Sequence, residues 1–258
     1  MDLGLALAMM LIALLGIPHG ALDPVVAKRA GLMNSSLAGL GFYTFYTLIA
    51  AVFVGLWLWL PLPSLLVFLL VSAQHFGRDW QGILRLGGFA YGAVILGLPA
   101  WLQAEAVHAI FEFLLFGGEA TVAVSALKGL GVIGLGLALI DIRRITVQRL
   151  AELGALTLCA WLLDPIWYFV VYFCGLHSPR HLAAEYQKLA SHERAQALRV
   201  MTFITLLTLA GALIVGFWVQ PAAMQLDALV IQITFIGLFA LTIPHMALIE
   251  WERSIHER

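Results

Sequence analysis

Charged residues are scarce in this chain, and their scarcity excludes an ordinary soluble fold. Asp, Glu, Lys and Arg make up 11% of the 258 residues, while apolar residues make up 62%, far from the shares of a soluble domain. The apolar runs approach the roughly 20 residues that a helix needs to cross a bilayer. No long polar region remains for a second domain. The composition therefore predicts an all-α, polytopic integral membrane bundle, with one transmembrane domain over residues 1–258.

The chain also has no excess of basic residues and only two cysteines. The net charge is −1, so no basic surface is available for nucleic acid. Cys159 and Cys174 both lie inside apolar runs, which excludes a disulfide framework and a CxxC pair, and we interpret Cys174 as a buried, inert thiol. The N-terminus lacks the positive region of a signal peptide. We therefore expect the first apolar run to remain as a membrane helix.

The apolar runs divide the chain into about eight to nine transmembrane helices. We expect them at residues 3–18, 37–60, 63–77, 83–102, 121–141, 147–163, 165–177, 199–219 and 226–249. Residues 104–116 and 179–190 carry apolar and polar side chains on opposite helical faces, so we expect two short helices that lie in the membrane interfaces.

The basic residues orient this set of helices. If every segment crosses once, all Lys and Arg residues except Lys128 fall on one side, and the positive-inside rule makes that side the cytoplasm. Lys128 lies in the first turns of its helix and can reach outward. The expected topology is that of an inner (plasma) membrane protein with its N-terminus outside and its C-terminus in the cytoplasm.

Five of the eight histidines fall at similar depth in the cytoplasmic half. They come from separate helices and are His19, His75, His177, His181 and His245. Ionisable groups at membrane depth are costly and mark functional sites. Clustered neutral imidazoles suit iron, copper, nickel or zinc, and the sequence does not choose among these metals. We expect the other three histidines, His108, His192 and His256, to be exposed to solvent.

The stretch His177-Ser178-Pro179-Arg180-His181 places two imidazoles around a break between helices. Ser178 is suited to the N-cap and Pro179 to the first turn of the second helix. The helices that end near His19, His75 and His177 are short, so each can stop below the surface and direct its partial negative charge at a cation. Pro18 and Pro244 each directly precede a histidine, and we expect a kink there.

Carboxylates and aromatic side chains accompany these histidines. We expect Asp23, Asp79 and Glu250 either to accept a hydrogen bond from the imidazole nitrogen that does not bind the metal or to be simple interfacial charges. His245 is placed with them, as such a supporting partner or as part of a substrate pocket. Some aromatic residues near the cluster could line a tunnel for an elongated apolar substrate; the candidates are Tyr43, Tyr46, Tyr168, Tyr172 and Phe173.

Four phrases in order along the chain resemble the Brp/Blh family of microbial β-carotene dioxygenases. They are Gly16-Ile17-Pro18-His19-Gly20-Ala21-Leu22-Asp23-Pro24, Gln74-His75-Phe76-Gly77-Arg78-Asp79, Tyr172-Phe173 followed by His177-Ser178 and His181, and Pro244-His245-Met246. The resemblance implies cleavage of the central double bond of β-carotene by O2 to two all-trans-retinal molecules. It also implies Fe(II) bound by His19, His75, His177 and His181, and a functional link to a retinal-binding rhodopsin.

Two other functions stay open at this point. A membrane lipid desaturase or hydroxylase shares the histidine-rich chemistry, but such enzymes carry more histidines in closely spaced boxes, and here only His177 and His181 have that spacing. A transporter or metal permease would place polar groups through both membrane halves, and the outer half here has few. The products formed from β-carotene under O2 distinguish all three.

Overall fold

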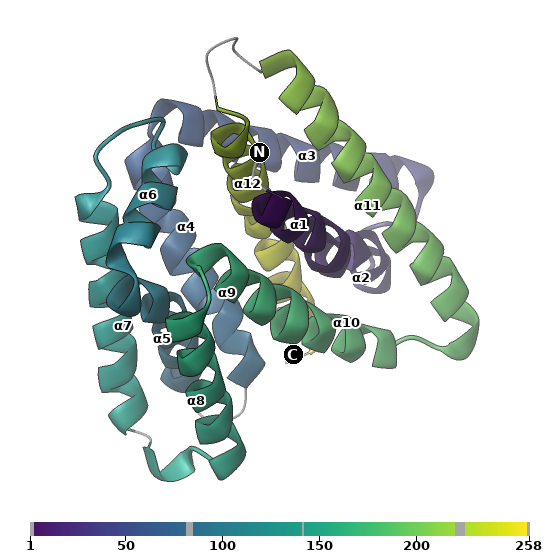
Figure 1. Cartoon of the computed structure of the whole chain (residues 1–258). Coiled ribbons are helices and arrows are strands. Elements are labelled where there is room, and N and C mark those ends of the chain that lie inside the picture. The colour runs from purple at the N-terminus through teal and green to yellow at the C-terminus, as the bar shows by residue number, and fades with distance from the viewer. Residues whose placement is uncertain (1–2, 81–84, 141, 220–224, 257–258) are drawn as a thin grey trace. The chain divides into compact units, whose positions relative to one another are not determined.

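The computed structural model describes residues 3–80, 85–140, 142–219 and 225–256, and no strand occurs among them (Figure 1). The prediction of an all-helical chain is confirmed. The α-helices are α1 (Leu3–Leu11), α2 (Asp23–Arg29), α3 (Ser36–Trp59), α4 (Pro61–Phe76), α5 (Arg85–Leu102), α6 (Ala104–Leu114), α7 (Thr121–Ile140), α8 (Val147–Leu162), α9 (Pro165–Tyr172), α10 (Ser178–Gln187), α11 (Ser191–Val219) and α12 (Leu226–His256). The other segments are the π-helices η1 (Ile12–Gly16) and η5 (Phe173–His177) and the 3-10 segments η2 (Ile17–Leu22), η3 (Gly77–Trp80) and η4 (Ile142–Arg144).

The chain divides into two compact units. The first contains Met1–Trp59 and Ser178–Arg258, and the second contains Leu60–His177. Whether they form the single transmembrane domain expected over residues 1–258 stays a prediction.

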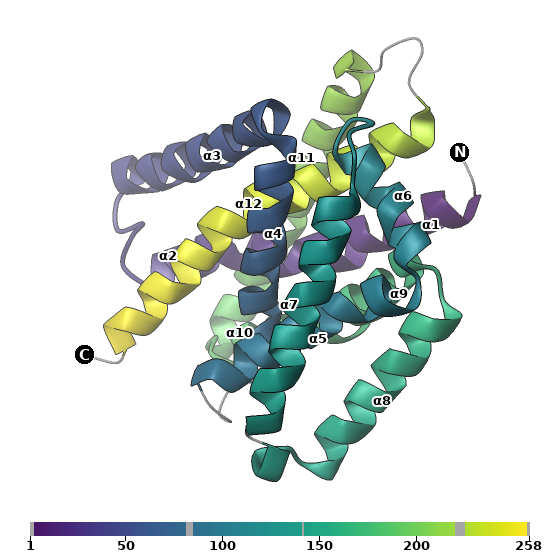
Figure 2. The same cartoon turned by 90° about the vertical axis from the view of Figure 1, so that its left-hand side faces the viewer.

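In the first unit, α12 is the long helix against which shorter segments pack. Trp57 at the end of α3 contacts Phe239 of α12, with ring centroids 5.1 Å apart. Val26 and Ala27 of α2 pack on Leu248, which lies closer to the C-terminal end of α12 than Phe239 does. Figure 2 shows α12 running as one helix past both α3 and α2. These apolar contacts hold the start of α2 and the middle of α12 in fixed relation.

In the second unit, α5 packs closely against both α4 and α7. A Cβ atom at Gly97 of α5 would lie 2.7 Å from the Cα of Gly131 in α7, and one at Gly88 would lie 2.7 Å from the Gly77 carbonyl oxygen. Glycine is therefore required where the backbones meet, as is common between membrane helices. This packing fixes the end of α4, which carries His75.

Five of the described helical segments are long and apolar enough to cross a membrane, and a sixth results if the bent pair Gly88–Leu102 and Ala104–Leu114 counts as one span. The sequence predicts eight to nine. The difference lies in α4 and α8, which have 16 residues each, and in α9, which has 8. By length and composition alone, such helices fall below a full span.

Most helix boundaries agree with the sequence, but three do not: α12 ends at His256 rather than at residue 249, and two other helices also differ. The first helix does not end at residue 18: the chain passes through η1 and η2 into α2 and stays helical to Arg29. Helix α11 begins at Ser191 rather than 199, because the helix continues through about two polar turns that precede the apolar run from which it is predicted. Residues 83, 84 and 141, at the ends of two expected helices, lie outside the described residues, as does the side chain of His256.

Both expected amphipathic helices are present. Helix α6 buries Val107, Phe111 and Leu114 on one face, and α10 begins at Ser178 with Pro179 in its first turn. Ser178 was expected to cap α10, but its hydroxyl donates to the Leu15 carbonyl oxygen at 2.6 Å. Leu15 lies in the π-helix η1, three residues before Pro18, which has no backbone N–H to donate, so the Ser178 hydroxyl supplies a donor to this carbonyl.

Candidate metal centre

His19 lies where the first helical segment changes its winding. The π-helix η1 ends at Gly16, and η2 follows with Pro18, which has no backbone N–H, in its first turn. His19 is buried, and its Nδ1 donates to the Gly16 carbonyl oxygen. Because a carbonyl only accepts, Nδ1 carries the proton and Nε2 carries the lone pair.

A carboxylate fixes the orientation of the His245 ring by a hydrogen bond at Nδ1. Its Nδ1 lies 2.7 Å from Oδ1 of Asp23, the first residue of α2. The Tyr46 hydroxyl of α3 donates to the other oxygen of Asp23 at 2.7 Å. Asp23 and His245 are each 2% exposed. A carboxylate on Nδ1 again places the lone pair on Nε2 and makes that nitrogen a better metal ligand.

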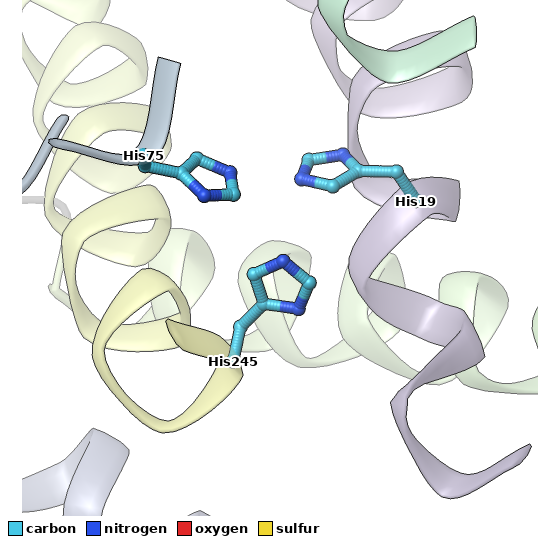
Figure 3. A group of neighbouring side chains, drawn as sticks. All are labelled: His19, His75 and His245. Carbon is cyan, nitrogen blue, oxygen red and sulfur yellow. The ribbon is translucent and has the colours of Figure 1, made fainter. Parts of the chain in front are cut away.

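His181 completes a group of three imidazoles in the first unit. Its ring centroid lies 5.6 Å from that of His19 and 5.2 Å from that of His245, and the His19 and His245 centroids are 5.4 Å apart. Figure 3 shows the His19 and His245 side chains extending from different helices into the same space. Three helices thus bring together histidines that are far apart in the sequence.

The second unit holds the other pair of histidines. The Nε2 atoms of His75, in the last turn of α4, and of His177, at the end of η5, are 2.9 Å apart. His177 Nδ1 lies 3.0 Å from Oδ1 of Asp79, whose Oδ2 accepts from the Tyr172 hydroxyl at 2.9 Å. His75 and His177 are 3% and 2% exposed.

Among the described residues, each unit therefore contains a tyrosine, an aspartate and a histidine that are linked by hydrogen bonds. Tyr46, Asp23 and His245 form the group in the first unit, and Tyr172, Asp79 and His177 form the one in the second. In both, the tyrosine fixes the carboxylate, and the carboxylate fixes the imidazole tautomer. Metal-binding histidines characteristically carry such a partner on the nitrogen that does not bind the metal.

The donor set fits a transition metal. His19 and His245 of the first unit are buried, and buried imidazoles of this kind are suited to a transition metal (Figure 3). Asp79 assigns the lone pair of His177 to Nε2, so the neighbouring His75 Nε2 either donates a proton to it or shares a cation with it. Two nitrogens that bind one metal at a right angle, each about 2.1 Å from it, lie about 3 Å apart. The 2.9 Å separation matches that geometry.

The aromatic candidates differ in their surroundings. Phe173 stacks on the His177 ring with centroids 5.8 Å apart, and Tyr172 packs beside the same ring. Tyr168 is buried and donates to the Ile95 carbonyl oxygen at 2.8 Å. Tyr43 is 41% exposed. Their roles in a substrate tunnel stay predictions.

Sequence reasoning missed two buried carboxylates in the first unit. Glu185 and Glu252 are each 5% exposed and both bind Arg29, whereas Glu250, expected near the histidines, is exposed. The spacing of Glu185, one helical turn after His181, was the available signal. The interpretation of residues 179–190 as an interfacial helix gives Glu185 no role near the histidines.

A helical chain with several potential membrane spans and buried, carboxylate-supported imidazoles belongs to the class of candidate membrane metalloproteins. A family model described as Beta-carotene 15,15'-dioxygenase matches residues 10–252, and the chain belongs to this family. It is 31% identical over 261 residues, 95% of this chain and 92% of the relative, to the Beta-carotene 15,15'-dioxygenase of uncultured marine bacterium 66A03. No solved structure matches the chain. The resemblance stated from the sequence motifs is confirmed.

Proposed function

We propose that the protein is a membrane-embedded non-haem Fe(II) dioxygenase that cleaves the central double bond of β-carotene with O2 to give two all-trans-retinal molecules. Family membership over residues 10–252 supports the activity. The observation that carries the metal assignment is the repeated arrangement of buried imidazoles backed by aspartates.

The proposed iron ligands are His19, His75, His177 and His181. His245 has the same burial and the same carboxylate support as His177, so we include it as a candidate fifth ligand in place of the supporting role expected from sequence. Bound iron would supply the activation of O2. Asp23 and Asp79 would keep the protons on Nδ1 of their histidines, and Tyr46 and Tyr172 would keep the carboxylates in place.

The substrate side of the proposal rests on apolar chemistry. β-Carotene partitions into lipid, so it would enter from the bilayer and lie against aromatic side chains. Tyr172 and Phe173 pack on His177 and are the best-supported candidates for this contact. Tyr43, Tyr46 and Tyr168 stay candidates for lining the proposed tunnel. The retinal formed would supply a retinal-binding rhodopsin.

The membrane setting is part of the proposal. We infer that residues 1–258 form one transmembrane domain in the inner membrane, with the N-terminus outside, the C-terminus in the cytoplasm and the metal site in the cytoplasmic half. The distribution of Lys and Arg supports this orientation.

A β-carotene-producing bacterial host provides the test. Expression of the wild-type chain should convert β-carotene to retinal, and His177→Ala should abolish retinal formation, because it removes a proposed ligand. The matched control is His108→Ala, which removes a partly exposed histidine of α6 that contacts Glu119 and should leave the yield unchanged. Wild-type retinal yield from His177→Ala would refute the assignment, and hydroxylated or desaturated carotenoid would indicate the other oxidase chemistry.

A further inference from the structure

A charged cluster links three helices of the first unit: α10, which carries His181, α12, which carries His245, and α2, which carries the Asp23 carboxylate that binds His245. Arg29 of α2 donates from Nη2 to Glu185 of α10 at 2.7 Å and from Nε to Glu252 of α12 at 2.8 Å. One guanidinium thus binds two carboxylates from segments more than 60 residues apart in the chain. Helix α2 begins at Asp23, the partner of His245.

Glu185 and Glu252 lie on the same helical faces as His181 and His245, respectively. Glu185 follows His181 by one helical turn on α10, and Glu252 follows His245 by two turns on α12. Residues with these spacings share a helical face. The cluster therefore fixes α10 and α12 at the faces that present His181 and His245.

Burial makes Arg29 decisive for this contact. The side chains of Glu185 and Glu252 are 6% and 7% exposed, and that of Arg29 is 24% exposed. Removing one partner from a buried ion pair is destabilising, and removal of Arg29 would leave two buried carboxylates with only the more exposed Lys188 as a cation near them. A planar guanidinium can bind two carboxylates in fixed directions, which an ammonium does less well.

Lys188 also binds this cluster, but from outside. Its Nζ lies 2.6 Å from Glu185 and 3.7 Å from Glu252, and its side chain is 48% exposed. Burial alone would raise the pKa of Glu185, but the hydrogen bonds from Arg29 and Lys188 outweigh it and lower the pKa below its usual value. Glu185 is therefore ionised at neutral pH and able to hold Arg29.

We propose that Arg29 is a positioning residue for the metal centre: by binding Glu185 and Glu252 together, it holds His181 and His245 at the spacing that metal binding requires. This inference rests on the proposed function, in which these imidazoles serve the metal. In this role Arg29 acts on the imidazoles through its contacts with Glu185 and Glu252.

The experiment measures metal affinity directly, in the purified full-length protein, by competition of Fe(II) or Co(II) with a chelator. Arg29→Met should lower the affinity about tenfold or more, within the range found for residues that support metal ligands, and should change the visible absorption of bound Co(II). Arg29→Lys should recover part of the affinity. Lys188→Met, which removes the exposed cation from the same carboxylates, should change it by less than about threefold.

Folded Arg29→Met protein with wild-type metal affinity and an unchanged Co(II) spectrum would overturn the proposal, because it would make the cluster purely structural. If Arg29→Met does not fold, Glu252→Gln, which keeps the side-chain volume, takes its place with the same expected loss and the same refuting result. Retinal formation by the wild type is measured in a separate assay. If the wild type binds metal but forms no retinal, the proposed function is refuted, while the effect of Arg29 on metal affinity can still be measured.

Discussion

The Asp79 and Asp23 side chains set the tautomer and the basicity of the imidazoles that they contact, His177 and His245. Each accepts from a histidine Nδ1 and from a tyrosine hydroxyl. The negative charge behind the ring raises the basicity of Nε2 and holds the ring in one orientation. An amide at the same position could accept one hydrogen bond but would supply no charge.

Asp79→Asn should therefore weaken metal binding by roughly 10- to 100-fold, measured by chelator competition on the purified protein, with little change in the amount of folded protein. Asp164→Asn is the matched control, because Asp164 caps α9 by accepting from the Ile166 N–H and asparagine caps a helix as well as aspartate does. Equal metal affinity of Asp79→Asn and wild type would show that the carboxylate does not support a ligand.

At the scale of elements, each unit has a π-helical segment that ends at a histidine or shortly before one. The segment η1 ends three residues before His19, and η5 ends at His177. A π-helical turn is rare and shifts the side chains that follow it around the helix axis, so it occurs often at functional sites. The Ser178 hydroxyl on the Leu15 carbonyl and the His19 imidazole on the Gly16 carbonyl satisfy groups in this altered turn.

Close packing of α5 and α7 gives a second prediction at this scale. A Cβ atom at Gly131 would lie 2.6 Å from Trp101 Cζ2 and 3.0 Å from the Gly97 Cα, whereas one at Gly129 would meet nothing within 4 Å. Gly131→Ala should cost about 1–3 kcal/mol through overpacking, seen as a lower melting temperature in detergent. Gly129→Ala should leave stability unchanged or slightly raise it. Equal melting temperatures for the two variants would contradict the described packing.

The sequence predicts most elements, since long apolar runs between Pro, Gly and charged residues leave few alternatives. It fails where winding changes without a change in composition: Pro18 suggests an end at residue 18, but the chain continues through a 3-10 turn to Arg29. Motifs identify His19, His75, His177 and His181, and their number suggests a common site. The contacts of Arg29 with Glu185 and Glu252 depend on long-range packing, which local spacing does not reveal.

On the scale of the whole molecule, the chain distributes its histidines over two compact units. The first unit contains His19, His181 and His245, and the second contains His75 and His177. Residues 177 and 178 are consecutive, yet they belong to different units. On the proposed function, bound metal would stabilise the folded protein, because a ligand that binds only the folded state shifts the folding equilibrium toward it.

The stoichiometry of the reaction of the purified, iron-loaded protein tests the central claim most directly. Incubation with β-carotene under O2, followed by chromatography, should yield two molecules of all-trans-retinal for each β-carotene consumed, and removal of iron with a chelator should stop the reaction until iron is restored. Unequal apocarotenal fragments, a hydroxylated carotenoid or iron-independent turnover would contradict the account.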